Sequence, residues 1–198
     1  MAILSSGIAM AQNANRHGFF LELGIGGLVG DTPRSSIFTT DNVLKYKYLS
    51  GGSADFGLGG RVRFGNHWAY EIKAEAQFPF ANPIHSLVGR ALPIGFRYTS
   101  VEIYRNYSLY THFNLGGAVT MNRGLCNSDQ LLLPNMNEVS LDYVGFGAAY
   151  SLGVGVNITT HLYIEAVFNG QVILESYGKN GKGTNNYGMV GCVAGYRF

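Results

Sequence analysis

The last twelve residues of the chain, 187–198, alternate in polarity up to the final position. Counted back from that position, every second side chain is apolar or aromatic: Phe198, Tyr196, Ala194, Cys192 and Val190. The positions between them are mostly small or polar, and they include Gly191, Gly195 and Arg197. A period of two residues is that of a β-strand with one apolar face. The segment therefore predicts a terminal strand that needs matching strands elsewhere in the chain.

Seven other segments alternate in the same way. They predict strands at residues 17–29, 43–65, 68–80, 91–98, 107–119, 141–156 and 162–174. The pattern is clearest in residues 68–80, where one face is apolar or aromatic and the other carries Glu71, Lys73 and Glu75. In residues 91–98 it places Leu92 with Ile94, Phe96 and Tyr98 on the apolar face, opposite Arg97. Residues 43–65 are about twice as long as a membrane strand, so their first half is expected to project into solvent.

Composition agrees with an all-β chain. Hydrophobic residues make up 46% of the 198 residues and charged residues only 13%, and there are 28 glycines. No run approaches the roughly 18 consecutive apolar residues of a transmembrane helix. The net charge of +2 gives no reason to expect nucleic acid as a partner. Cys126 and Cys192 are too few for a disulfide framework, and both are expected to be unpaired.

The predicted connections alternate in length along the chain. The long ones are residues 30–42, 82–90, 121–140 and 176–186, and the shorter ones are 66–67, 99–106 and 157–161. Membrane barrels have short turns at one end and long loops at the other, with an even number of strands. The sequence therefore predicts an all-β fold, an eight-stranded antiparallel up-and-down transmembrane β-barrel.

The two faces of the strands differ in charge and in volume. The charged face also carries most of the strand glycines, which save space inside a closed barrel, so we expect it to line the lumen. An eight-stranded barrel is just wide enough for its interior side chains to fill it. The predicted lumen charge network consists of Glu22, Arg61, Arg63, Glu71, Lys73, Glu75, Arg97, Glu165 and Arg197. Four negative against five positive charges predict internal ion pairs and a filled lumen.

Aromatic side chains cluster where the predicted strands end. Membrane barrels place belts of aromatic residues at both lipid–water interfaces. The predicted interface aromatics are Phe64, Trp68, Tyr70, Phe78 and Phe80, with Tyr46 and Tyr48 near the long-loop end.

The strand pattern and the ending Tyr196-Arg197-Phe198 resemble the small eight-stranded bacterial outer-membrane barrels of the OmpA and OmpX type. The resemblance implies an outer-membrane location and contact with membrane lipid and lipopolysaccharide. It also implies insertion by the outer-membrane assembly machinery, with Tyr196 and Phe198 as the assembly signal. The resemblance further implies a role in envelope integrity, adhesion or host-surface interaction.

The N-terminal residues suggest export. Ala9-Met10-Ala11 has the small-x-small form of a signal-peptidase site and follows apolar residues, although no Lys or Arg precedes them. Residues 1–11 are therefore interpreted as a residual signal peptide and residues 12–198 as the barrel domain. An ordinary apolar N-terminus is the alternative.

No catalytic, cofactor-binding or metal-binding residues are predicted. The five histidines lack partners at metal-ligand spacing. His112 is expected to face the lumen beside Tyr110 and Asn114, and Ser108 shares its face, but no acid completes a triad. The chain is accordingly predicted not to be an enzyme.

Three functions remain open at this point. The favoured one is a monomeric envelope-structural or surface-interaction barrel that contacts a surface protein ligand through loops 30–55 and 121–140. The second loop carries an apolar patch, Leu131-Leu132-Leu133-Pro134. A narrow channel for small solutes and a lipid A-modifying enzyme are the alternatives.

Overall fold

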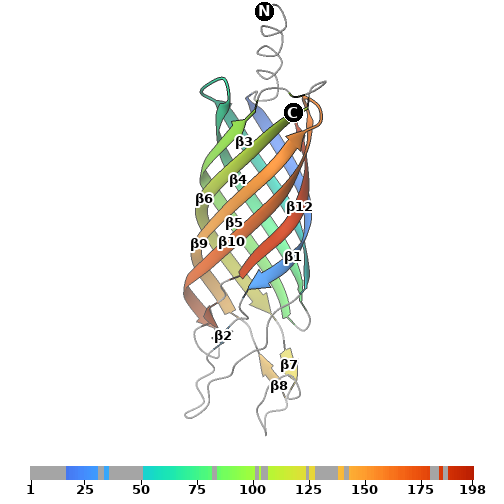
Figure 1. Ribbon diagram of the computed structural model, residues 1–198. Helices are drawn as coiled ribbons and strands as arrows, with labels where there is room; N and C mark the ends of the chain where they lie inside the picture. The colour runs from blue at the N-terminus through green and yellow to red at the C-terminus, as the bar shows by residue number, and fades with distance from the viewer. Residues whose placement is uncertain are drawn as a thin grey trace, which may run out of the picture.

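Eight long strands close into one antiparallel barrel in the computed structural model (Figure 1). The structure describes residues 17–30, 34–35, 51–81, 84–100, 103, 107–123, 125–127, 138–140, 143–178, 183–184 and 187–198. The barrel strands are β1 (Gly18–Gly30), β3 (Gly52–Arg63), β4 (Trp68–Ala81), β5 (Ile84–Thr99), β6 (Ser108–Arg123), β9 (Tyr143–Asn157), β10 (Leu162–Gly178) and β12 (Tyr187–Arg197). Each pairs with its neighbours in the chain, and β1 pairs with β12. The predicted fold class is confirmed.

The short turns and the end of the chain share one end of the barrel. Phe64 N donates to Trp68 O at 3.2 Å across the first turn, and Ile158 N donates to Leu162 O at 2.9 Å across another. Phe198 N donates to Phe19 O at 3.0 Å, which seals the last strand against the first. The described part of the chain contains no helix that is long and apolar enough to span a membrane.

Four short strands lie beyond the opposite end of the barrel. β2 (Arg34–Ser35) pairs with β11 (Gly183–Thr184), and β7 (Leu125–Asn127) pairs with β8 (Glu138–Ser140). Figure 1 shows β2, β7 and β8 at the end away from the C-terminus. The first and last long connections of the chain are therefore joined by backbone pairing.

Several predicted boundaries differ from the structure. β6 and β10 end at Arg123 and Gly178, four residues after their predicted ends at 119 and 174. Residues 84–90 belong to β5, although they were predicted to be loop. Their polar and glycine content suggested a connection, but Val88 and Arg90 are buried in the lumen and Leu87 is exposed, as strand alternation requires. β3 begins at Gly52, and residues 43–50 of the predicted long strand lie outside the described residues.

A β-bulge in β5 reverses the predicted direction of Leu92. Lys73 pairs with Leu92 and Glu71 with Gly95, so β5 has one more residue than β4 between these two pairs. The extra residue falls at Pro93, which has no N–H for the ladder. Leu92 is consequently buried rather than on the lipid side, while Ile94 after the bulge is exposed as predicted.

Glycines on the lumen side make room for large side chains on neighbouring strands. Gly195 lies directly opposite Tyr163 in the β10–β12 register, and a Cβ at Gly195 would overlap the tyrosine ring. Gly155 stands in the same relation to Tyr110. Each of these tyrosines therefore faces a glycine on the neighbouring strand, which lets a narrow barrel hold aromatic rings.

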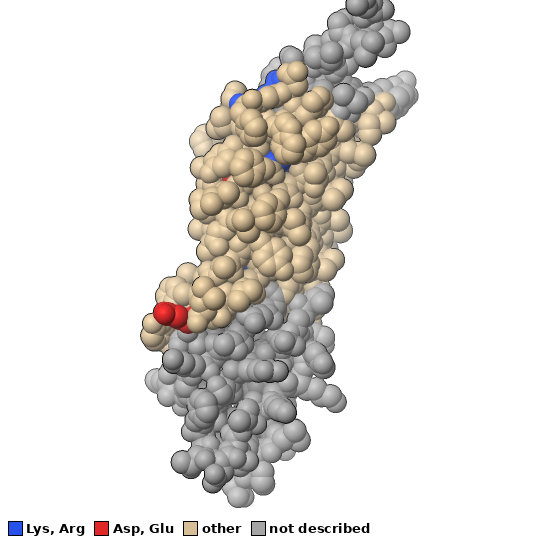
Figure 2. Space-filling model, turned by 60° about the vertical axis from the view of Figure 1, so that its left-hand side comes forward, with Lys and Arg blue, Asp and Glu red and all other residues tan. Residues whose placement is uncertain are grey.

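The outer wall is almost entirely apolar. Phe19 is 76% exposed and Ile25 72% exposed on β1, and each of the other barrel strands also presents large apolar side chains. Figure 2 shows this wall as a nearly continuous uncharged surface between the two ends of the barrel. Such a wall suits lipid and is unsuited to water.

Candidate functional site

The lumen holds most of the charged side chains that the structure describes. Ten of them are buried: Glu22, Asp55, Glu71, Glu75, Glu165, Arg61, Lys73, Arg90, Arg97 and Arg197. Five are acidic and five are basic, so this buried set is balanced. Unpaired charges would be costly at this depth, and the arrangement of the pairs therefore decides what the lumen can do.

Glu71 on β4 is the centre of the group nearest the short-turn end. Its carboxylate forms an ion pair with Arg61, and its Oε1 lies 3.6 Å from Arg97 Nη1. Arg97 is fully buried, and its guanidinium lies 3.3 Å from the centroid of the Tyr110 ring. Its Nη2 also donates to Asn157 Oδ1 at 2.9 Å. One carboxylate thus joins charges from three neighbouring strands, β3, β4 and β5.

Lys73 is the centre of a second group in the lumen. Its Nζ lies 2.5 Å from Glu22 Oε2 and 2.6 Å from Glu75 Oε1. Arg90 Nη1 reaches the other oxygen of Glu75 at 3.3 Å, and Tyr163 Oη donates to Glu22 Oε1 at 2.7 Å. This group therefore spans the lumen from β1 and β10 to β4 and β5.

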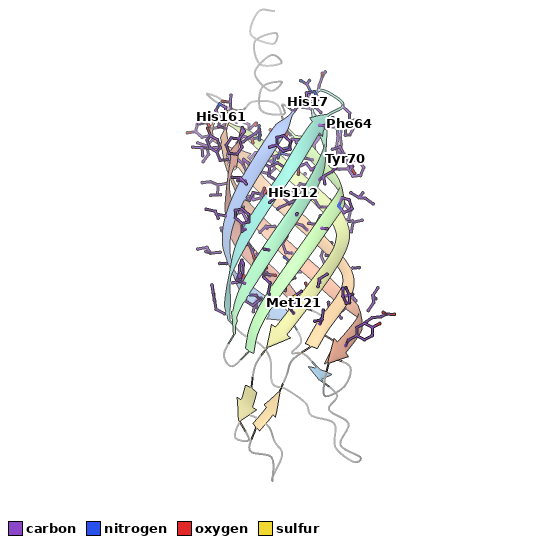
Figure 3. The ribbon with its side chains drawn as sticks, turned by 180° about the vertical axis from the view of Figure 1, so that it is seen from behind. His17, Phe64, Tyr70, His112, Met121 and His161 are labelled. Carbon is purple, nitrogen blue, oxygen red and sulfur yellow. The ribbon has the colours of Figure 1, made fainter. Side chains whose placement is uncertain are left out.

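His112 lies between the two groups, inside the barrel (Figure 3). Its Nδ1 is 3.6 Å from Glu165 Oε2 and 3.9 Å from Glu71 Oε2. Tyr110 Oη donates to the same Glu165 oxygen at 2.9 Å. Tyr110 also packs edge-on against Tyr163 of the second group, with ring centroids 5.9 Å apart, so the two groups are in contact across the lumen.

The structure brings together eight of the nine residues predicted for the lumen network and leaves out one. Arg63 is half-exposed at the end of β3, where its guanidinium donates to Gly65 O and to Asn66 Oδ1. Arg63 keeps the parity of the inward side chains, but it is the last residue of β3, and its guanidinium bonds the adjoining turn.

Two buried charges were missed from the sequence. Arg90 was missed because its segment was interpreted as loop. Asp55 shares odd-numbered parity with Arg61 on β3, and this parity was sufficient to find it. These two opposite charges cancel each other, so it is the exclusion of Arg63 that makes the charge of the lumen balanced rather than one unit positive.

The inward Ser and His do not form a catalytic pair. Ser108 and His112 are four residues apart on β6, which separates them by about 13 Å along the strand. Ser108 Oγ instead accepts a hydrogen bond from Asn157 Nδ2 at 2.9 Å. Over the described residues, no group of three His, Cys, Asp or Glu side chains is placed to hold a metal ion.

Aromatic side chains surround the short-turn end of the outer wall. Trp68 packs edge-on against Tyr98 with ring centroids 5.1 Å apart, and Phe64 packs against Phe96 at 6.5 Å. Figure 3 shows Phe64, Tyr70 and His161 around this end. Of the other predicted interface aromatics, Phe78 and Phe80 are exposed toward the loop end of β4, whereas Tyr46 and Tyr48 lie outside the described residues.

The C-terminal residues extend this aromatic rim. Tyr196 stacks on His161 with centroids 5.7 Å apart and meets Phe198 edge-on at 5.1 Å. Cys192, further along the same outward face, is a free thiol exposed on the wall. The side chain of Cys126 lies outside the described part of the chain.

Deleting Phe198 is expected to lower the amount of barrel inserted in cells more than it lowers the stability of refolded protein. The residue adds one hydrogen bond and one ring contact to the finished barrel, whereas assembly must recognise the end of the last strand. Immunoblots of membrane fractions and urea unfolding in micelles measure the two effects separately. Phe198→Tyr, which keeps the aromatic end, should insert normally, and equal insertion without Phe198 would refute its role as a signal.

Comparison with known proteins rests on structure alone. No protein-family model matches the chain, and no curated protein sequence matches it. Among solved structures, neisserial surface protein A aligns over 91% of this chain and 97% of its own, with a TM-score of 0.52 and 15% identity. The chain therefore shares the eight-stranded barrel fold of this outer-membrane protein.

Other outer-membrane barrels align over similar lengths. OprG from Pseudomonas aeruginosa covers 94% of this chain and 98% of its own, with a TM-score of 0.47 and 16% identity. Ail, the attachment invasion locus protein of Yersinia pestis, covers 92% of this chain and all of its own, with a TM-score of 0.43 and 16% identity. At these sequence identities, the similarity to solved structures shows the fold alone.

Proposed function

We propose that the chain is an integral protein of the bacterial outer membrane that acts in envelope structure or surface interaction through its loops. The observation that carries the proposal is the combination of an apolar outer wall with a lumen filled by paired charges. The wall anchors the protein in lipid, and the lumen is occupied by its own side chains. Ligands dissolved in the external water can then be contacted at the loop end, where loops carry the specificity of such scaffolds.

A narrow solute channel is the weaker alternative because apolar side chains also fill the lumen. Leu92, Ala118 and Ala149 form one buried cluster. A second consists of Val167, Met189 and Val193, with Leu28 packed against it. Together with the ion pairs, these clusters leave the solute pathway without a continuous polar lining.

An enzymatic role is also disfavoured by geometry. The distance between Ser108 and His112 along β6 prevents the hydrogen bond that activates a serine nucleophile. His112 faces Glu71 and Glu165 instead, inside the polar network. The absence of catalytic activity stays a prediction.

The loop end offers backbone edges to a protein partner. The pairs β2–β11 and β7–β8 are only two strands wide, so each has edges free to pair within the described residues. Extended peptides commonly bind by adding a strand to such an edge. β2 lies in the first loop predicted to carry binding, 30–55, and β7 and β8 lie in the second, 121–140. β11 lies in the last long connection, 176–186.

To test this role, residues 31–51 and 124–140, the parts of loops 30–55 and 121–140 that lie outside the barrel strands, are replaced by tight turns. Gly52–Asp55 of β3 and Met121–Arg123 of β6 are kept. We expect the shortened protein to fold, because the barrel strands retain their pairing, and to lose binding of cells to host surface proteins. A matched variant that shortens only residues 179–182 should keep binding. Folding is read from the faster migration of unheated protein on gels, and binding from adhesion of cells that display each variant. Unchanged adhesion after loss of both loops would leave a purely structural membrane protein.

A further inference from the structure

The lipid-facing wall is hollowed over β5, β6 and β9. A groove of about 530 Å³ is lined on its outward side by Gly89, Ala91, Gly117, Val119 and Phe146. It meets a second groove of about 320 Å³ at Ala91, which continues over β3 and β4 toward the short-turn end. The larger groove lies in the half of the wall nearer the loops, because Phe146 is only three residues from the loop end of β9.

Strand register explains why the outer surface is hollowed at this point. Four small residues stand side by side across four strands: Ala74 pairs with Ala91, Ala91 with Gly117, and Gly117 with Ala148. All four are exposed on the outer face. The same row continues to Leu58 on one side and Val172 on the other, so large side chains bound it. An acyl chain that enters this row can lie against the backbone.

A carboxylate is exposed at the loop end of the same groove. In β10 the register shifts between Ile173 and Glu175, and the bulge turns Glu175 out of the lumen to stand opposite Phe146. Glu175 is exposed, whereas the other charged side chains whose burial the structure describes are buried or, for Arg63, half-exposed. Figure 2 shows an acidic patch at the loop end of an otherwise uncharged wall.

The carboxylate is tied to the groove by Tyr177. Tyr177 Oη donates to Glu175 Oε2 at 2.9 Å, and its ring packs edge-on against Phe146 at 6.5 Å. Phe146 is itself a wall of the groove. A charged side chain is costly on the lipid face at the middle of a bilayer and tolerated near its interface. The groove therefore runs from the hydrocarbon region to a hydrogen-bond acceptor at the level of the lipid headgroups.

We propose that this groove binds a glycolipid of the outer leaflet, with one acyl chain over Ala91 and Gly117 and sugar N–H or O–H donors on Glu175. The inference rests on the proposed outer-membrane location, since in that membrane the leaflet on the loop side consists largely of glycolipid. The apolar groove is continuous with the lipid-facing wall, and the carboxylate accepts hydrogen bonds that the sugar amide and hydroxyl groups donate.

The test is lipid retention by the full chain refolded in micelles. Purified lipid A and phosphatidylethanolamine are titrated in turn, and bound lipid is counted by native mass spectrometry. Gly89→Leu with Gly117→Leu places apolar bulk in the groove. The new Cβ atoms are accommodated, because a Cβ at Gly89 meets nothing within 4 Å and one at Gly117 meets only Gly147 O at 3.6 Å. We expect this double variant to lower lipid A retention about tenfold, and Glu175→Gln to lower it about fivefold.

Ala194→Leu is the matched control. Ala194 is a small outward residue on β12 that lines neither groove, so its replacement should leave retention unchanged. Equal retention by all variants, or stronger retention of phosphatidylethanolamine than of lipid A, would overturn the proposal. The slower migration of heated protein on gels is checked for every variant. If heating did not slow the migration of the unmodified protein, that result would count against the outer-membrane location itself, independently of the lipid site.

Discussion

Replacing Glu71 with alanine is expected to lower the free energy of unfolding by about 3–5 kcal/mol, the cost of leaving buried charges without their partner. Glu71 is nearly fully buried, and its carboxylate serves both Arg61 and Arg97. Alanine removes that carboxylate and leaves two guanidinium groups facing each other in the lumen. Urea unfolding in detergent micelles, followed by tryptophan fluorescence of Trp68, measures the change.

Two variants separate this effect from the loss of volume. Glu71→Gln keeps the shape and a hydrogen-bond acceptor but removes the charge, so it should fall between the unmodified protein and Glu71→Ala. Glu175→Ala removes an exposed carboxylate and is expected to change stability by less than about 1 kcal/mol. Equal stability of Glu71→Ala and Glu175→Ala would show that the buried network contributes little.

Gly116→Ala is expected to destabilise the barrel by about 3 kcal/mol or to prevent folding, because overpacking here meets backbone. A Cβ at Gly116 would overlap the carbonyl oxygen of Ala91 and come within 2.8 Å of Leu92 Cα. Those atoms belong to the bulge in β5, which has no flexible side chain to move aside. Refolding yield and urea unfolding in micelles measure the effect.

The neighbouring residue provides a control on the same strand. Gly117 faces outward, and its Cβ would meet only Gly147 O at 3.6 Å. Gly117→Ala should therefore leave the free energy of unfolding unchanged or raise it by up to about 1 kcal/mol, because alanine lowers the conformational entropy of the unfolded chain. A Gly116→Ala barrel as stable as the Gly117→Ala barrel would mean that the bulge is not tightly packed against β6.

Alternation predicted the barrel because side-chain direction in a strand depends only on parity. Trp68 to Phe80 has a charged face so regular that no turn or bulge competes with it. Leu92 shows where parity fails: the bulge at Pro93 inserts a residue, and nothing in the alternation of residues 91–98 marks its position. Glu175 was likewise placed by a bulge. Arg90 was lost because His, Ser and Gly residues before it resemble a loop.

The partners within the lumen could not be predicted from parity. Whether Lys73 contacts Glu22 or Glu165 depends on the stagger between strands that are distant in the chain, and only the closed barrel determines this stagger. The sequence showed that the inward charges nearly cancel. The structure shows that Glu71 and Lys73 each join two charged partners, so the balance is achieved in connected groups rather than in separate pairs.

Single-channel recording in planar lipid bilayers tests the central claim, a lipid-embedded barrel whose lumen is closed by its own side chains. The protein is first refolded in micelles, and its folded state is verified by faster migration on unheated gels. With the barrel inserted, we expect no steady current, because the ion-paired groups around Glu71 and Lys73 and the apolar cluster at Leu92 block the lumen. Large, long-lived currents from the unmodified protein would contradict the account, as would a stable protein that remains soluble without detergent.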